Sequence, residues 1–282
     1  MTARSVAIAL LLTLTTFAAA YAEDAYVVRF FAFGRGTECA QSLWLDNILF
    51  FNRTSAPAVV KLLGVSNGPV PPDVLRELSL PPNRAVAIRN GHPFSGSYPW
   101  QPQASAPLWV VHLDIPEGVT IESRDEVYAV PLCGLTDGRD GLPEDESAGK
   151  VSLPIFRSLV PAGVRQIKLG TDLSSHGSRL NVAIYNAATE EAHATIEIRR
   201  VCDDALLDTR SVVIAADAIT QFGGFSGSGG RCLGSGVEAL YTAITVDRPG
   251  FSYVSNVSES LPSLGLGIVP PIGLAVSNST DY

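Results

Sequence analysis

A histidine and a carboxylate two residues apart are the first residues in this sequence whose types and spacing could do chemistry. His112 and Asp114 lie in an alternating segment, so both side chains project to one face of a predicted strand, a geometry that can bind a metal ion. Trp109, Val111 and Leu113 lie on the opposite face, which indicates a core on that side and water on the other. We therefore predict a structural role for His112 and Asp114, without metal or cofactor.

The closest match to a serine-hydrolase motif is incomplete. Such enzymes hold the nucleophile on a strand-to-helix turn with the pattern Gly-x-Ser-x-Gly. Residues 224–228 read Gly-Phe-Ser-Gly-Ser, which lacks the last glycine, and no helical pattern follows. We interpret this segment as a flexible loop closed by Cys232. We predict no catalytic residue in the chain, and hence a protein that is not an enzyme.

An acidic stretch between residues 134 and 150 has the ligand type that calcium prefers. It contains Asp137, Asp140, Glu144, Asp145 and Glu146. Their spacing differs from the EF-hand pattern, and glycines and a proline interrupt them. We interpret the stretch as a solvated linker, and calcium binding remains the alternative.

Aromatic side chains in an irregular segment are the candidate ligand-binding residues. His92, Tyr98 and Trp100 lie in the proline-rich stretch Asn90–Pro107, which interrupts the alternating segments. Rings on such a loop can stack on a sugar or anchor a partner protein. The alternative is that Trp100 packs under its own loop.

The beginning of the chain predicts a cleavable signal peptide, residues 1–22. Arg4 supplies the positive charge, Val6 to Ala18 form the apolar core, and Ala20-Tyr21-Ala22 fits the signal peptidase pattern. The apolar core is shorter than the roughly 20 residues that span a bilayer. We expect an exported protein, in the periplasm, at the cell surface or in the medium, with no integral membrane segment in the mature chain.

The charge of the chain argues against nucleic acid as a partner. The net charge is −8, the basic residues are scattered, and Arg199-Arg200 is the only basic pair after the signal. Phosphate neutralisation requires clustered lysine and arginine.

The four cysteines, Cys39, Cys133, Cys202 and Cys232, are an even number in a chain predicted to be exported, which indicates two disulfides. We favour Cys39–Cys133 and Cys202–Cys232 among the three possible connectivities, since each bond then stays within one half of the chain. No Cys-x-x-Cys spacing indicates zinc.

Alternation with period two recurs along the chain and predicts an all-β fold. In the first half the predicted strands are Tyr26–Phe33, Ser42–Phe51, Ala58–Leu63, Arg84–Arg89, Trp109–Asp114 and Val127–Val130. In the second half they are Gln166–Thr171, Arg179–Tyr185, Thr195–Arg200, Thr209–Ala215, Tyr241–Val246 and Phe251–Val257. Helical spacing is scarce, and only Pro72 to Leu78 could form a turn or two of helix.

The two halves contain matching features in the same order, which indicates an internal repeat. A strand ends at Asn52 in the first half and at Asn186 in the second. The later matches are Leu80–Asn83 with Ile214–Asp217, and Thr120–Asp125 with Ile244–Pro249. The predicted organisation is a signal peptide (1–22), a first β-sandwich domain (23–133), an acidic linker (134–163), a second β-sandwich domain (164–261) and a C-terminal tail (262–282).

These features resemble a group of exported bacterial proteins built from tandem immunoglobulin-like β-sandwich repeats. The matching residues are Asn186-Ala187, Leu80–Asn83 and Asp247–Phe251, and the resemblance covers Gln41–Val130 and Val164–Ser258. It implies two tandem immunoglobulin-like antiparallel sandwiches and an extracellular structural or binding role. It implies no catalytic residues.

The sequence therefore favours a non-catalytic binding or structural module that recognises an extracellular or envelope protein or a glycan through loops at the sandwich ends. A secreted carbohydrate-active or other hydrolase is the first alternative. An envelope chaperone-like protein that accepts a partner strand at a sheet edge is the second.

Overall fold

The structure is a computed structural model that describes residues 23–30, 32–34, 40–67, 77–89, 108–131, 149–152, 154–170, 179–225, 240–257 and 274–277. In these residues there is no helix, and most of them lie in strands of antiparallel sheets. The prediction of an all-β fold is confirmed. The predicted signal peptide lies outside the described residues.

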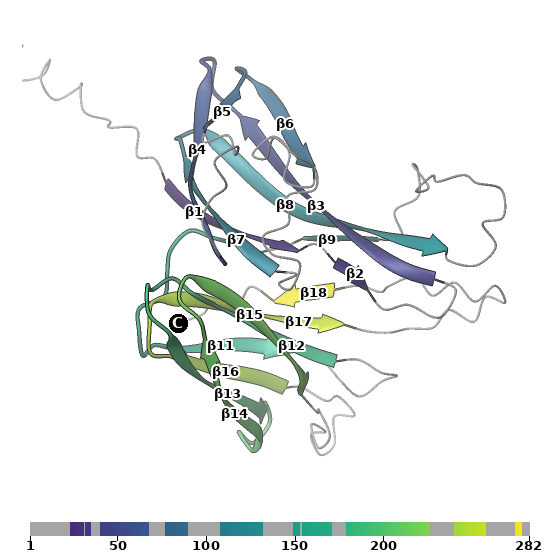
Figure 1. Cartoon of the computed structure of the whole chain (residues 1–282), viewed down its shortest axis with the longest axis vertical. Coiled ribbons are helices and arrows are strands. Elements are labelled where there is room, and N and C mark those ends of the chain that lie inside the picture. The colour runs from purple at the N-terminus through teal and green to yellow at the C-terminus, as the bar shows by residue number, and fades with distance from the viewer. Residues whose placement is uncertain are drawn as a thin grey trace, which may run out of the picture.

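Two sheets, A and B, enclose the first apolar core (Figure 1). In the described residues sheet A has the order β10 (Ile155–Phe156), β1 (Glu23–Phe30), β7 (Leu108–Ile115), β4 (Ala58–Val65) and β5 (Glu77–Leu80). Sheet B has the order β2 (Ala32–Gly34), β3 (Ala40–Asn52), β8 (Val119–Pro131) and β9 (Gly149–Ser152), and β6 (Arg84–Arg89) also pairs with β3. We call this pair the first sandwich.

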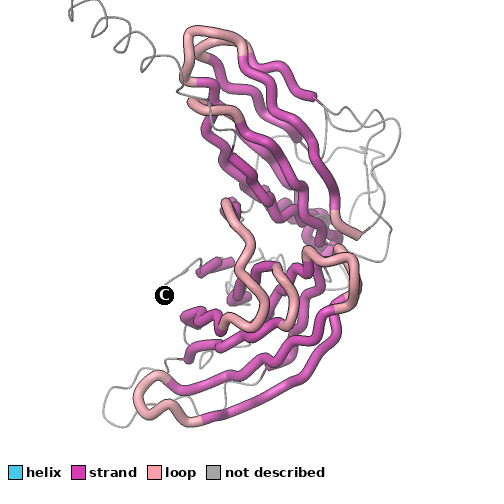
Figure 2. Tube along the Cα trace, turned by 90° about the vertical axis from the view of Figure 1, so that its left-hand side faces the viewer, coloured by secondary structure: helices cyan, strands magenta, loops and turns pink. Residues whose placement is uncertain are grey.

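Two further sheets, C and D, enclose the second core. Sheet D has the order β11 (Arg165–Gly170), β16 (Leu240–Val246), β13 (Ala192–Arg200) and β14 (Leu206–Ile214). Sheet C has the order β15 (Ala218–Phe225), β12 (Arg179–Asn186), β17 (Gly250–Val257) and β18 (Leu274–Ser277). Figure 2 shows this second sandwich as a separate stack of strands below the first.

Alternation explains how each strand divides its side chains between core and surface. In β13, Ala192, Ala194, Ile196 and Ile198 are buried in the second core, and the residues between them face outward. β4 and β5 show the same alternation, and such period-two patterns located most of the strands in the sequence.

The structure also contains strands that the sequence patterns did not indicate. Residues 77–78, at the end of the segment with predicted helical spacing, belong to β5, whose four residues alternate between exposed and buried. The predicted linker contributes β9 and β10 to the first sandwich. Leu274–Ser277, in the predicted C-terminal tail, pairs with β17.

Both sandwiches have the same strand order. The order β1-β7-β4-β5 in sheet A corresponds to β11-β16-β13-β14 in sheet D, and the neighbours of β3 correspond to those of β12. In the immunoglobulin constant fold the last strand pairs with the strand before it. Here β8 follows β7 but pairs with β3 in the other sheet, and β17 likewise pairs with β12.

A buried asparagine ends the second strand of the first sandwich. Asn52 donates from Nδ2 to the carbonyl oxygens of Ala56, Leu80 and Pro81, at 2.8, 3.3 and 3.1 Å. Its Oδ1 accepts the backbone N–H of Thr54 at 2.9 Å. One side chain therefore ties the end of β3 to the following turn and to the end of β5.

The second sandwich repeats this bonding pattern at the same sequence separations. Asn186 donates to the carbonyl oxygens of Glu190, Ile214 and Ala215, which lie 4, 28 and 29 residues later, as the three acceptors do for Asn52. Its Oδ1 accepts the backbone N–H of Ala188 at 3.0 Å. The first of the matched sequence features thus corresponds to a shared structural corner.

The second matched feature corresponds as well, but the third does not. Asn83 and Asp217 both have positive φ angles, of 50° and 44°, in the turns that close these corners. The segment 120–125 lies inside the single strand β8, whereas Ile244–Pro249 spans the end of β16 and the turn before β17. The third alignment is wrong because β8 is longer than its pattern suggested.

A third apolar cluster joins the outer face of sheet A to the outer face of sheet C. Sheet A contributes Tyr26, Val28, Leu108, Val110 and Phe156, and sheet C contributes Ala183, Tyr185, Ile219, Phe251 and Tyr253. The rings of Phe156 and Phe251 stack with centroids 3.9 Å apart. We call this cluster the internal interface.

Polar bonds from Asn67 add to the internal interface. Asn67 follows β4 with a φ of 65°, and its backbone N–H donates to the carbonyl of Asp217 at 2.8 Å. Its Oδ1 accepts the backbone N–H of Ile219 at 3.2 Å. Apolar contacts and directional bonds together fix one sandwich against the other.

Candidate functional site

The candidate ligand-binding residues His92, Tyr98 and Trp100 lie outside the described residues, and so does the acidic stretch 137–146. Their predicted roles therefore stay predictions.

One of the four cysteines lies in the described part of the chain. Cys202 is exposed in the turn after β13 and is disulfide-bonded. Cys39, Cys133 and Cys232 lie outside the described residues, so the predicted pairing stays a prediction.

His112 and Asp114 lie on the same face of β7, and the residues between and before them enter the first core. The imidazole of His112 stacks on Tyr26, with ring centroids 4.3 Å apart and planes inclined by 13°. Its Nε2 lies 3.4 Å from Oδ1 of Asp24. Within the described ranges no three His, Cys, Asp or Glu side chains converge to hold a metal ion.

The stacked histidine lies beside a tyrosine–carboxylate pair at the internal interface, in which Tyr185 is buried and Asp217 is exposed. The hydroxyl of Tyr185 donates to Oδ1 of Asp217 at 2.9 Å. Burial raises the pKa of Asp217, although the Tyr185 hydrogen bond and the nearby His112 oppose this shift. Burial and the neighbouring carboxylate raise the pKa of Tyr185 above its ordinary value. Tyr26 and Tyr185 belong to the third apolar cluster, which joins the two sandwiches.

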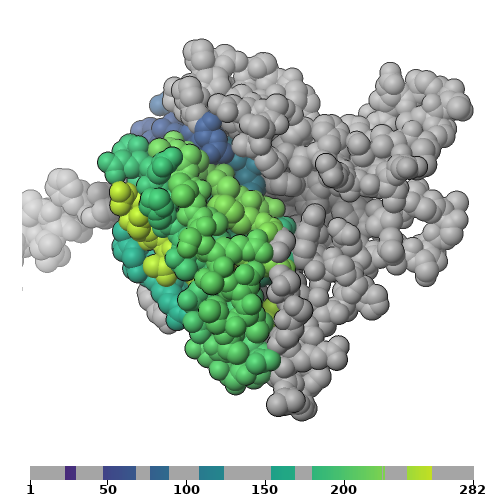
Figure 3. Space-filling view, turned by 60° about the horizontal axis from the view of Figure 1, so that its bottom comes forward, coloured from purple at the N-terminus to yellow at the C-terminus, as the bar shows by residue number. Residues whose placement is uncertain are grey.

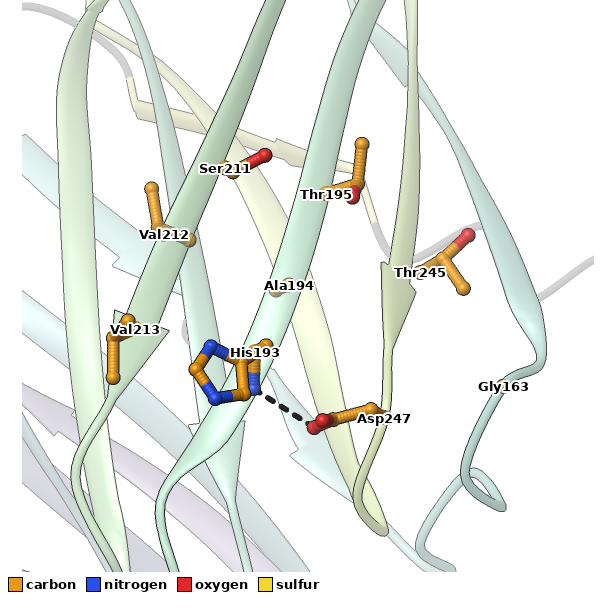
Figure 4. A pocket seen from close by; sticks show the side chains of 9 residues that line it. All are labelled: Gly163, His193, Ala194, Thr195, Ser211, Val212, Val213, Thr245 and Asp247. Atoms are coloured by element: carbon orange, nitrogen blue, oxygen red, sulfur yellow. Dashed lines mark hydrogen bonds between the residues drawn. The ribbon is translucent and has the colours of Figure 1, made fainter.

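The outer face of sheet D presents an open pocket with a volume of about 370 Å³ (Figure 4). Its lining residues come from β13, β14, β16, the adjoining turns and the loop before β11: Gly163, His193, Ala194, Thr195, Ser211, Val212, Val213, Thr245 and Asp247. Figure 3 views the molecule from below Figure 1, where residues 180–225 (green) face the viewer.

The pocket combines a histidine, a carboxylate and three hydroxyls. Oδ1 of Asp247 accepts the backbone N–H of His193 at 2.8 Å, and the backbone N–H of Asp247 donates to the carbonyl of His193 at 3.0 Å. A catalytic triad instead requires the carboxylate to orient the imidazole ring. The bonds that join His193 and Asp247 therefore shape the rim of the pocket, and Ser211, Thr195 and Thr245 can donate and accept hydrogen bonds on its floor.

A chain of ion pairs lies beside the pocket on the same sheet face. Glu197 is bonded to Arg165 at 3.0 Å and to Arg199 at 2.9 Å, and Arg199 reaches Asp204 at 3.2 Å. The hydroxyl of Tyr241 donates to Asp204. The hydrogen bond from Arg199 lowers the pKa of Glu197, and the Tyr241 hydrogen bond lowers that of Asp204. Exposed pairs stabilise the fold little, but this network fixes charges of both signs on the surface.

The sequence patterns did not indicate the pocket. The predicted strand began at Thr195, whereas His193 already lies in β13, paired with Val213 of β14. The outward positions of β13 carry His193, Thr195, Glu197 and Arg199, a polar row that was visible as alternation. Its partners on β14 and β16 come from distant parts of the chain, so only the sheet brings them together. Of the segment 224–228, Gly224 and Phe225 end β15, and Ser226 lies outside the described residues.

Comparison with known proteins assigns no family to this chain. No protein-family model matches it, and neither a curated protein nor a solved structure matches it significantly. In the part of the chain that the structure describes, no helix has the length and hydropathy of a membrane span.

Proposed function

We propose that the protein is an exported, non-catalytic binding module that captures a protein partner on the outer face of sheet D. Its body consists of two tandem immunoglobulin-like sandwiches, duplicated from one ancestor, in which the last strand has changed sheet. The signal peptide pattern and the even number of cysteines support export. The observation that carries the proposal is the polar pocket on a sheet face that the core holds rigid.

The lining of the pocket favours a protein over a glycan. Sugar sites commonly stack a ring on an aromatic side chain, and the residues that line this pocket include no Phe, Tyr or Trp. They pair hydroxyls with exposed aliphatic surface, such as Val213, which is 52% exposed. A polypeptide offers both backbone hydrogen bonds and apolar side chains to such a surface. The loop that carries Trp100 remains a second contact region of the same proposal.

A second candidate is the capture of an extended partner strand at β14. In the described residues β14 forms one edge of sheet D, has nine residues and contains no proline. An edge strand presents unpaired backbone groups that a partner strand can complete. Ser211 and Val213 belong to both β14 and the pocket, so a strand added at this edge would lie next to the pocket.

A hydrolytic role has less support. The pocket has histidine, serine and carboxylate side chains, but Asp247 bonds the backbone of His193. Ser211 faces the sheet surface from the middle of a strand, without the turn that exposes a nucleophile in hydrolases.

The test is affinity capture with the mature, disulfide-intact protein as bait for envelope proteins, secreted proteins and a panel of polysaccharides. The deciding variant is Val213→Lys, and the matched control is Leu206→Lys. Leu206 is 49% exposed on the same strand but does not line the pocket. A partner lost with Val213→Lys and retained with Leu206→Lys supports the pocket.

Further variants separate the alternatives. Trp100→Ala should weaken capture only if the segment Asn90–Pro107 contributes to the contact with the partner. Thr209→Pro places proline in the edge strand, so a larger loss with Thr209→Pro than with Val213→Lys favours strand addition. Capture of a polysaccharide that survives Val213→Lys would refute the proposal.

A further inference from the structure

The outer face of sheet B corresponds, position by position, to the face of sheet C that is buried in the internal interface. In sheet B, Phe51 pairs with Ala85 of β6 and Thr120 of β8. In sheet C, Tyr185 pairs with Ile219 of β15 and Phe251 of β17. Phe51 precedes Asn52 at the end of β3, and Tyr185 precedes Asn186 at the end of β12. The strand pairing in sheet B therefore has the same register as that in sheet C.

Large apolar side chains occupy two of these positions in sheet B, and within the described residues no further sheet packs on them. Leu49 and Phe51 are 37% and 38% exposed, whereas Ala183 and Tyr185 at the equivalent positions are 1% and 5% exposed. Ala85 and Ala87 beside them are also exposed. Neighbouring exposed apolar residues on one sheet face mark an interaction surface.

The complementary face is present on sheet D. Sheet C packs on β1 and β7 of sheet A, where Tyr26 pairs with His112. The equivalent strands of sheet D are β11 and β16, where Ile167 pairs with Ala243. Ile167 and Tyr241 are partly exposed there. The arginines and carboxylates nearby are already paired with one another, so a docked sheet would bury no unpaired charge from this network.

We infer that the outer face of sheet B of one copy docks on the β11–β16 face of sheet D of a second copy, which repeats the internal interface between molecules. The contact is heterologous, because the two faces that meet are different. A copy that docks through one face still has its other face available for the next copy. Association can therefore continue beyond a dimer. The pocket residues on β13 and β14 lie outside the contact strands, whereas Thr245 lies on β16, so a docked copy would border the pocket.

Sedimentation velocity of the mature, disulfide-intact protein over a concentration series tests this inference. Wild-type protein should form species larger than dimers as the concentration rises. Phe51→Ser should weaken this association by about tenfold or more, because truncation of a central aromatic side chain removes a large share of interface energy. Ile167→Ser on the other face should weaken it as well.

Mixing the two variants gives the sharper result. Phe51→Ser keeps an intact sheet D and Ile167→Ser keeps an intact sheet B, so the mixture should form heterodimers and nothing larger. Leu63→Ser is the control, because Leu63 is 47% exposed on β4, outside both faces. Thermal unfolding checks that each variant is folded, and Leu49→Ser replaces Phe51→Ser if that variant is not.

Two outcomes would overturn the inference. A wild-type protein that stays monomeric at every concentration excludes association through these faces. A dimer that Ile167→Ser leaves intact and Phe51→Ser abolishes indicates a symmetric contact between two B sheets instead.

Discussion

The two sandwiches share their corners and differ on their outer faces. At the corners, Asn52 and Asn186 are both fully buried and bond to acceptors at identical sequence separations. On the outer faces, Thr120 of β8 corresponds to Phe251 of β17. Phe251 is fully buried against the first sandwich, while Thr120 is partly exposed.

This difference separates what the fold requires from what assembly requires. A corner asparagine satisfies backbone carbonyls that would otherwise be buried without partners, and both sandwiches of this chain use it. An outer face has no such requirement, and its side chains follow whatever covers it. Equivalent positions can therefore carry threonine in one copy and phenylalanine in the other.

The largest expected effect comes from truncating the side chain at the outer position that Phe251 and Thr120 share. Phe251→Ala should lower the free energy of unfolding by about 3–5 kcal/mol, because it leaves a cavity in the internal interface. Thr120→Ala, at the equivalent position of the first sandwich, should change it by less than about 0.5 kcal/mol. Denaturant unfolding measures both. Equal losses would contradict the difference between the two faces.

The corner asparagines should behave alike, with an intermediate effect. Asn52→Ala and Asn186→Ala should each lower the free energy of unfolding by about 2–4 kcal/mol, since each leaves buried carbonyls without their donors. Asn47→Ala, on the same strand as Asn52 but partly exposed, is the control and should cost well under half as much. A large effect in only one sandwich would break the equivalence of the corners.

The smallest effect concerns the turn residue that differs between the corners, Asn83 in one and Asp217 in the other. Because burial raises the pKa of Asp217 above its ordinary value of 3.8, the folded state retains that proton to a higher pH than the unfolded state does. The free energy of unfolding then falls as the pH rises from 3.8 through the folded pKa.

Asp217→Asn should remove this dependence, since the amide oxygen can still accept from Tyr185 and asparagine tolerates a positive φ. The stability of the variant relative to wild type should be greatest at neutral pH and should decrease slightly as the pH falls toward 3.8, because solvent around the exposed Asp217 side chain screens the effect. Thermal unfolding at a series of pH values measures it, with Tyr185 and His112 unchanged. A constant difference across the series would show that Asp217 does not titrate differently in the folded state.

Much of the secondary structure could be predicted, because alternation is a local property of strands that cover a core on one side. The strand Arg84–Arg89 was predicted with the bounds that it has. Short strands such as Ile155–Phe156 were not, because two residues cannot show a period and their pairing with β1 is non-local. The pocket was missed for the same reason, since β13, β14 and β16 meet only in the sheet.

The sequence by itself determined most of the strands and their inward faces, together with the asparagine corners that recur at equal spacing. Only the tertiary structure decided which outward faces are covered. Alternation distinguishes the two sides of a strand, but it does not say what lies beyond the outer side. Tyr26 and Phe251 begin two separate predicted strands, and they meet because sheet A docks on sheet C across more than two hundred residues of chain.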